Sequence, residues 1–177
     1  MKFFLDTADL AEIEKAFKLG ILDGVTTNPA LLSKQSLSYK EGIKKIVELT
    51  EGAIVFAEVL ANSADEMVKE GREMNTWGPN MIVKLPMIPA GIQACSQLSH
   101  EGVKCAITMV YSVAQALVAA KAGAVYIAPF IARANEVGVD GLNTVSEIAD
   151  VYQAQGIETG ILTASLRTGR DAAESLR

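Results

Sequence analysis

The chain has 177 residues, of which 50% are hydrophobic, and its 21 acidic and 16 basic side chains give a net charge of -5 at pH 7. This length can bury one sizeable core, so we predict a single domain over residues 1–177. The acidic balance without a Lys/Arg cluster argues against nucleic acid as a partner, and the apolar stretches are too short for the ~20 residues of a membrane span.

Short apolar runs, typical of buried strands, alternate with helical patterns along the chain. The predicted strands are residues 2–6, 24–27, 53–59, 81–85, 104–108, 125–129 and 160–165. The predicted helices are residues 9–20, 39–50, 64–74, 90–102, 112–123 and 142–156, followed by a last helical pattern over 168–177. Four of them end at a glycine that can form a left-handed C-cap: Gly20, Gly102, Gly123 and Gly156.

Nearly continuous apolar strands separated by helices indicate an α/β fold with a parallel sheet covered by helices. Spacings of roughly 20 to 35 residues between strands favour a (β/α)8 TIM barrel. An open dinucleotide-binding sheet lacks support, because no glycine-rich phosphate motif follows the first strand. A closed barrel requires eight strands and the sequence predicts seven, so we expect the eighth strand and a terminal helix to be missing from this chain.

Lys84 lies in the middle of the apolar run "PNMIVKLPM". Lysine is almost never fully buried without compensation. The structural alternative is a lysine whose amine reaches solvent from a strand end. In a barrel strand, burial instead favours the neutral amine, which can attack a carbonyl and form a Schiff base.

Other polar residues stand at or just after the ends of the predicted strands, where barrel enzymes gather their chemistry. Each has a simpler interpretation as a helix start or a surface group, but together they converge on one face. The candidate residues are Asp6, Thr26, Asn28, Glu58, Lys84, Thr108, Arg133, Ser165 and Arg167. Asp6 and Glu58 could move the protons that Schiff-base chemistry requires. No histidine cluster accompanies these carboxylates, which makes a metal site a poor alternative.

Several motifs resemble the small-subunit branch of the transaldolase and fructose-6-phosphate aldolase family, in order along nearly the whole chain. They are "FFLDTAD", "GVTTNPALL", "FAEV", "IVKLP", "TMVYSVAQAL", "AAKAGA", "YIAPFIAR" and "ILTASLRT". The resemblance implies a class I aldolase barrel without metal or organic cofactor. It implies Lys84 as the Schiff-base lysine and Asp6 as the general acid/base. It further implies Glu58 and Thr108 at the catalytic water, Thr26 and Asn28 at the donor's hydroxyls, and Arg133, Ser165 and Arg167 at the sugar phosphate.

Four positions distinguish branches of that family. Larger transaldolases resemble this chain less at Ala106 and Ala128, where they carry asparagine and serine. The aldolase branch has a glutamine where this chain has Glu58 and a tyrosine where it has Phe130. Phe130 is therefore a further candidate substrate-site residue. Ala106 and Ala128 agree with the small-subunit branch. Glu58 and Phe130 favour a transaldolase that transfers dihydroxyacetone from fructose 6-phosphate or sedoheptulose 7-phosphate to an aldose phosphate. The alternative is a fructose-6-phosphate aldolase that releases free dihydroxyacetone.

The resemblance also implies a place in carbohydrate metabolism, in the pentose phosphate pathway, and a homo-oligomer, a pentamer or decamer. The opening "MKFFLDTADLAE" leads into an acidic helix without a cleavage-site pattern, so we expect no signal peptide and a cytoplasmic protein. Cys95 and Cys105 lack metal-ligand spacing and are expected to be reduced, structural thiols. Two other classes stay open: a lyase or isomerase barrel for another carbonyl phosphate, and a barrel without catalytic activity.

Overall fold

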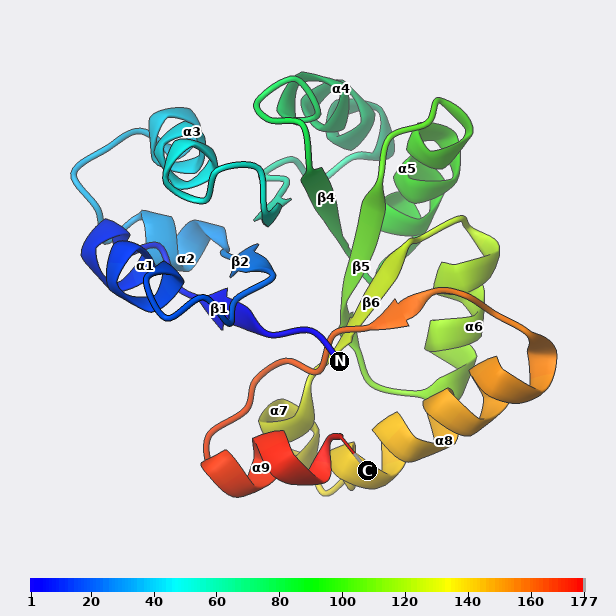
Figure 1. The fold of residues 1–177 in the computed structure, drawn as a ribbon. Helices are drawn as coiled ribbons and strands as arrows, with labels where there is room; N and C mark the ends of the chain where they lie inside the picture. The colour runs from blue at the N-terminus through cyan, green and yellow to red at the C-terminus, as the bar shows by residue number, and fades with distance from the viewer. Residues whose placement is uncertain (177) are drawn as a thin grey trace. The chain divides into compact units, whose positions relative to one another are not determined.

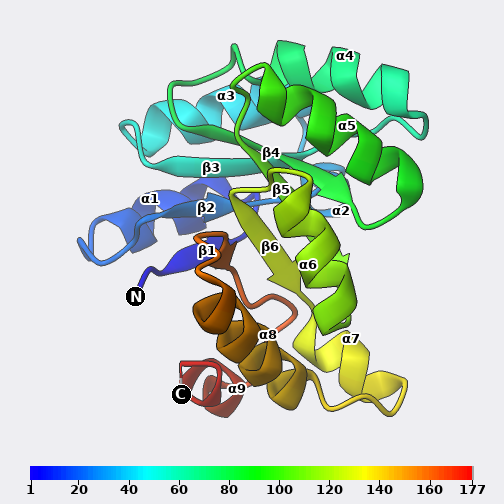
Figure 2. The same cartoon turned by 90° about the vertical axis from the view of Figure 1, so that its right-hand side faces the viewer.

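A computed structural model describes residues 1–176 as parallel strands alternating with helices (Figures 1 and 2). The strands are β1 (Phe4–Asp6), β2 (Gly24–Thr26), β3 (Ile54–Glu58), β4 (Met81–Pro86), β5 (Cys105–Val110), β6 (Tyr126–Pro129) and β7 (Gly160–Ile161). The helices are α1 (Leu10–Phe17), α2 (Pro29–Leu32), α3 (Tyr39–Leu49), α4 (Ala64–Met74), α5 (Pro89–His100), α6 (Val113–Lys121), α7 (Ile131–Glu136), α8 (Gly141–Gln155) and α9 (Gly169–Glu174). This succession of seven parallel strands and covering helices confirms the predicted α/β barrel class.

The chain forms two compact units, Met1–Lys84 and the residues from Leu85 onward, with the boundary inside β4. In the first unit, β1 to β4 pair in chain order, all parallel. The register sets Asp6 beside Thr26 and Glu58 beside Lys84. Two pairs of candidate residues are therefore neighbours across strands.

The core of the first unit is built from strand side chains and the inner faces of the helices. Phe56 of β3 is completely buried and packs edge-on against Phe4 of β1, with ring centroids 5.3 Å apart. Ile13 of α1 and Ile43 of α3 are also completely buried, and these two helices contact each other. A side chain at Gly24 would collide with the Ile54 carbonyl, so only glycine allows this approach of β2 to β3.

In the second unit, β5, β6 and β7 pair in chain order and parallel. Helices α5 and α6 pack against β5 and against each other, and α8 contacts α6 and α7 (Figure 2). The ladder between β5 and β6 is interrupted after Thr108, where Met109 forms a bulge with a φ of 61°. Bulges are common next to active sites because they redirect side chains.

The predicted left-handed glycines are confirmed, because Gly20, Gly102, Gly123 and Gly156 all have positive φ, between 64° and 89°. Helix α1 itself ends before its glycine, at Phe17. Helices α2 and α7 were not predicted, since four and six residues are too short to show a helical period. The predicted length of the last strand, 160–165, is wrong, because the strand in the structure is shorter.

Beyond Ile161 the pairing of that segment with β6 is irregular. The structure has only Gly160–Ile161 as β7, then an isolated bridge from Ala164 to Phe130. The amides of Leu162 and Ala164 still donate to the Ile127 and Pro129 carbonyls of β6. The extended backbone stops only at Ser165, whose φ is 59°. None of the helices between residues 1 and 176 combines the length and the apolar composition that a membrane crossing requires.

Candidate active site

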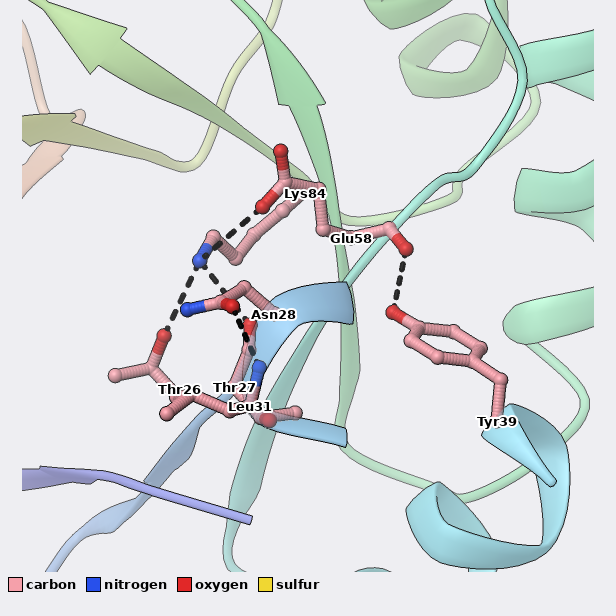
Figure 3. A network of polar contacts seen from close by, with 7 residues as sticks. All are labelled: Thr26, Thr27, Asn28, Leu31, Tyr39, Glu58 and Lys84. Atoms are coloured by element: carbon pink, nitrogen blue, oxygen red, sulfur yellow. Dashed lines mark hydrogen bonds and ion pairs between the residues drawn. The ribbon is translucent and has the colours of Figure 1, made fainter. Parts of the chain in front are cut away.

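Lys84 is buried in the centre of a polar network in the first unit (Figure 3). It lies in β4 with a relative exposure of 6%, flanked by the completely buried residues Val83 and Leu85. Its Nζ donates to the Thr27 carbonyl oxygen at 3.2 Å and to Thr26 Oγ1 at 3.4 Å. The amine therefore does not reach out to solvent, and the alternative of a strand-end lysine directed into water does not describe this position.

Glu58 is the acidic partner nearest to this amine. Its Oε2 lies 3.8 Å from Lys84 Nζ, which the strand register explains because the two residues are paired across β3 and β4. Its side chain is only partly exposed, at 20%. Asp6, at the end of β1, is more exposed than Glu58 and interacts with the same amine electrostatically.

The protein shifts the protonation of all three groups toward their neutral forms. Burial lowers the pKa of Lys84, and the charges of Glu58 and Asp6 oppose this shift. Loss of hydration raises the pKa of Glu58, which Lys84 counteracts and Asp6 reinforces. Loss of hydration also raises the pKa of Asp6, against the effect of Lys84. Shifts that come from burial beside specific charged partners are typical of functional sites.

The loop after β2 carries two further candidate residues. Asn28 caps α2, because its Oδ1 accepts a hydrogen bond of 3.0 Å from the Leu31 amide. The side-chain oxygen thus has a structural role, in agreement with the simpler interpretation of Asn28 as a helix start. Its side-chain amide nitrogen remains the group that could contact a substrate. Thr26 contacts Lys84 through its hydroxyl, as described above.

In the second unit, Arg133 and Arg167 both form ion pairs with the Glu136 carboxylate. Glu136 lies 3.3 Å from Arg133 and 4.0 Å from Arg167, measured between the side-chain nitrogen and oxygen atoms. All three side chains are more than half exposed, so these ion pairs add little stability. Two guanidinium groups that share one oxyanion can also share another, such as a phosphate.

Ser165 and Thr108 occupy unusual environments in the same unit. Ser165 has a positive φ, and its carbonyl accepts a hydrogen bond of 3.1 Å from Ala132 N, at the start of α7. Thr108 is 1% exposed, and its Oγ1 has no hydrogen-bond partner among residues 1–176. An unpaired buried hydroxyl is costly unless a water or ligand satisfies it.

Phe130 and the two alanines complete this unit's candidate positions. The Phe130 ring is half-buried and packs against Tyr111, with centroids 6.2 Å apart. Ala106 and Ala128 are buried on β5 and β6. Their methyl groups offer no hydrogen bond to a substrate.

Sequence reasoning missed three residues of these networks: Thr27, Tyr39 and Glu136. Thr27 contributes its carbonyl to Lys84, and its own buried hydroxyl lacks a partner within the described chain. Tyr39 donates to the Glu58 carbonyl. Only Glu136 had a sequence signal, since it follows Arg133 by three residues, the spacing of a helical ion pair. No three His, Cys, Asp or Glu side chains within residues 1–176 gather closely enough to hold a metal ion.

Comparison with known proteins places this geometry in a family. Residues 3–176 match the family described as Transaldolase/Fructose-6-phosphate aldolase. A "Probable transaldolase" of Geobacillus thermodenitrificans is 45% identical over 167 residues, which cover 94% of this chain and 78% of that protein. One of Leptospira biflexa is 46% identical over the same length, covering 94% and 78%. One of Methanococcus maripaludis is 47% identical, covering 94% and 77%.

A solved structure is similar in fold alone. A flavocytochrome b2 variant with sulfite bound superposes on 99% of this chain with a TM-score of 0.69 and 11% sequence identity. The chain spans 54% of the length of that protein.

Proposed function

This chain belongs to the transaldolase/fructose-6-phosphate aldolase family, and from that membership we propose that it is a transaldolase acting through a Schiff base on Lys84. The buried Lys84 amine beside Glu58 is the observation that supports this proposal most. The donor is a ketose phosphate, fructose 6-phosphate or sedoheptulose 7-phosphate. The acceptor is an aldose phosphate such as erythrose 4-phosphate.

The proposed reaction begins with the neutral Lys84 amine, which attacks the C2 carbonyl of the donor. The carbinolamine then loses water, and the carboxyl groups of Glu58 and Asp6 move the protons that this step requires. The product is an iminium that can accept an electron pair. We propose Thr108 as a ligand of the water involved, since its buried hydroxyl has no partner in the described residues.

Bond cleavage follows when Asp6 takes the proton of the C4 hydroxyl. The C3–C4 bond breaks, its electron pair moves into the iminium, and the aldose phosphate leaves. The remaining three-carbon enamine attacks the carbonyl of the acceptor, and Asp6 returns its proton. Hydrolysis of the new imine releases the product ketose phosphate and regenerates the Lys84 amine.

Trapping the intermediate tests this mechanism. Incubation with fructose 6-phosphate and borohydride, followed by peptide mass mapping, should locate a three-carbon adduct on Lys84. Erythrose 4-phosphate added before the borohydride should discharge the adduct. An unlabelled Lys84, or an adduct on another lysine, would refute the proposal and would favour a barrel without this activity.

Arg133→Ala tests the proposed phosphate site. A charge-assisted hydrogen bond contributes about 1.5–3 kcal/mol, so KM for fructose 6-phosphate should rise by about one to two orders of magnitude. KM for unphosphorylated dihydroxyacetone should change little. Arg170→Ala removes the same charge from an exposed position of α9 and serves as the control. Equal effects of Arg133→Ala on both kinds of substrate would mean that Arg133 has only a structural role.

Phe130→Tyr tests transfer against simple cleavage, the activity of the aldolase branch. A hydroxyl at this position could hold a water that protonates the enamine, whereas the Phe130 ring offers only an apolar face. The unmutated protein should therefore transfer dihydroxyacetone faster than it releases it, and Phe130→Tyr should shift the ratio toward release. Phe130→Leu, which adds no hydroxyl, should not shift it. Faster release than transfer by the unmutated protein would identify it as an aldolase.

We further propose that the protein acts in the pentose phosphate pathway in the cytoplasm, as a homo-oligomer. The family membership supports these assignments. Size-exclusion chromatography with light scattering measures the oligomeric state, and a pentamer or decamer is the expected result.

A further inference from the structure

Tyr39 contacts the backbone of Glu58 from outside the predicted site. It is the first residue of α3, and its hydroxyl donates a hydrogen bond of 2.5 Å to the carbonyl oxygen of Glu58, the last residue of β3. Figure 3 shows the Glu58 carboxylate directed toward Lys84 and the Glu58 carbonyl directed toward Tyr39. A single residue, Glu58, therefore connects the tyrosine hydroxyl to the Lys84 amine.

Tyr39 is itself held in place by its surroundings. The preceding residue, Ser38, is the N-cap of α3 and forms a capping box in which its hydroxyl and amide both contact the Glu41 carboxylate. The Tyr39 ring packs edge-on against Trp77, with centroids 6.3 Å apart. Burial also raises the pKa of Tyr39, so its hydroxyl keeps its proton and remains a donor. Its hydrogen bond to Glu58 thus comes from a preorganised group.

The backbone that follows Glu58 is held as well. Val59 N donates to the Lys84 carbonyl oxygen at 3.1 Å, which links the end of β3 to β4. The Glu70 carboxylate of α4 accepts hydrogen bonds from the next two amides, at 2.7 and 3.0 Å. Tyr39 adds a contact to the carbonyl side of the same segment. The end of β3 is therefore fixed from two helices and from its neighbouring strand.

We propose that Tyr39 is a positioning residue that keeps the Glu58 carboxylate beside the Lys84 amine. This inference rests on the proposed Schiff-base function. The Glu58 carbonyl and the Val59 amide belong to the same peptide group, so the Tyr39 hydroxyl and the Lys84 carbonyl hold one peptide plane from its two sides. The direction of the Glu58 side chain depends on that backbone. Tyr39 and Glu58 both line a cavity of about 100 Å³, together with Trp77 and Met74. Without the Tyr39 hydroxyl, water can enter this space and solvate the carbonyl, and the peptide group keeps only the hydrogen bond from Val59 N to the Lys84 carbonyl.

Tyr39→Phe removes only the hydroxyl and is the first test. The loss of one hydrogen bond predicts a kcat about tenfold lower, with little change in KM because Tyr39 is not one of the proposed substrate-binding residues. Tyr152→Phe is the matched control, since the Tyr152 hydroxyl donates a 2.7 Å hydrogen bond to the Ala116 carbonyl of α6, which bears no site residue. Tyr152→Phe should leave kcat unchanged.

A double-mutant cycle with Glu58→Gln separates positioning from general stability. If Tyr39 acts through the Glu58 carboxylate, Tyr39→Phe should have almost no further effect on kcat in the Glu58→Gln protein. If the two substitutions instead multiply their separate effects, Tyr39 does not act through Glu58 and the proposal is overturned. Circular dichroism melting of each variant shows whether the fold is retained.

A readout without turnover distinguishes this inference from the proposed function. Reductive methylation of Lys84 over a range of pH reports the pKa of its amine, whether or not the protein has transaldolase activity. Tyr39→Phe should move that pKa in the same direction as Glu58→Gln, by a smaller amount. An unchanged pKa overturns the role of Tyr39 even if the three-carbon adduct forms. A shifted pKa without any adduct supports the positioning by Tyr39 and overturns the Schiff-base function.

Discussion

Lys84→Arg is expected to lower transaldolase turnover by several orders of magnitude while the fold persists. Arginine keeps the positive charge, but its guanidinium does not lose its proton in proteins and so cannot attack a carbonyl. Steady-state transfer from fructose 6-phosphate to erythrose 4-phosphate measures the loss. The borohydride adduct should disappear in the same variant.

The matched control for this substitution is Lys104→Arg, an exposed lysine directly before β5. That variant should keep normal turnover. If Lys84→Arg retained even about a tenth of the unmutated activity, the assignment of Lys84 as the nucleophile would be wrong.

The pH dependence of trapping provides a second measurement on Lys84. Burial lowers the pKa of this amine from its usual value of 10.5, so the neutral form appears at lower pH than for a lysine in water. The initial rate of adduct formation should rise with pH through a midpoint below 10.5. A midpoint at or above that value would mean that the amine is not desolvated in solution.

Asp6→Asn is expected to stop the reaction at a later step. Asparagine cannot take the proton of the C4 hydroxyl, and the loss of a general base lowers rates by about 10²–10⁴-fold. Because Lys84 is unchanged, the donor should still condense with the amine. Borohydride should therefore trap a six-carbon adduct on Lys84 in this variant, in place of the three-carbon adduct of the unmutated protein.

Asp9→Asn is the control for Asp6→Asn. Asp9 caps α1 by accepting hydrogen bonds from the Ala11 and Glu12 amides, and asparagine is an equally good N-cap. Its turnover should be normal and its adduct should contain three carbons. A three-carbon adduct in Asp6→Asn at the normal rate would show that another group takes the C4 proton.

The order of strands and helices could be predicted because it depends on local patterns. A parallel strand buried on both faces reads as a continuous apolar run, and each glycine after a helix marks a left-handed turn. Lys84 was conspicuous for the same reason, since a charged residue within such a run conflicts with its burial. The short helices α2 and α7 and the early end of β7 could not be predicted, because too few residues carry a pattern.

The sequence by itself determined the fold class and the residues at the strand ends, because these follow from periodicity and from where each strand stops. Only the tertiary structure decided which of those residues meet. Register placed the Glu58 carboxylate 3.8 Å from Lys84, α3 brought the Tyr39 hydroxyl to a carbonyl 19 residues away, and Glu136 received two arginines from separate segments. Such contacts depend on how strands pair and helices pack, and no window of neighbouring residues encodes them.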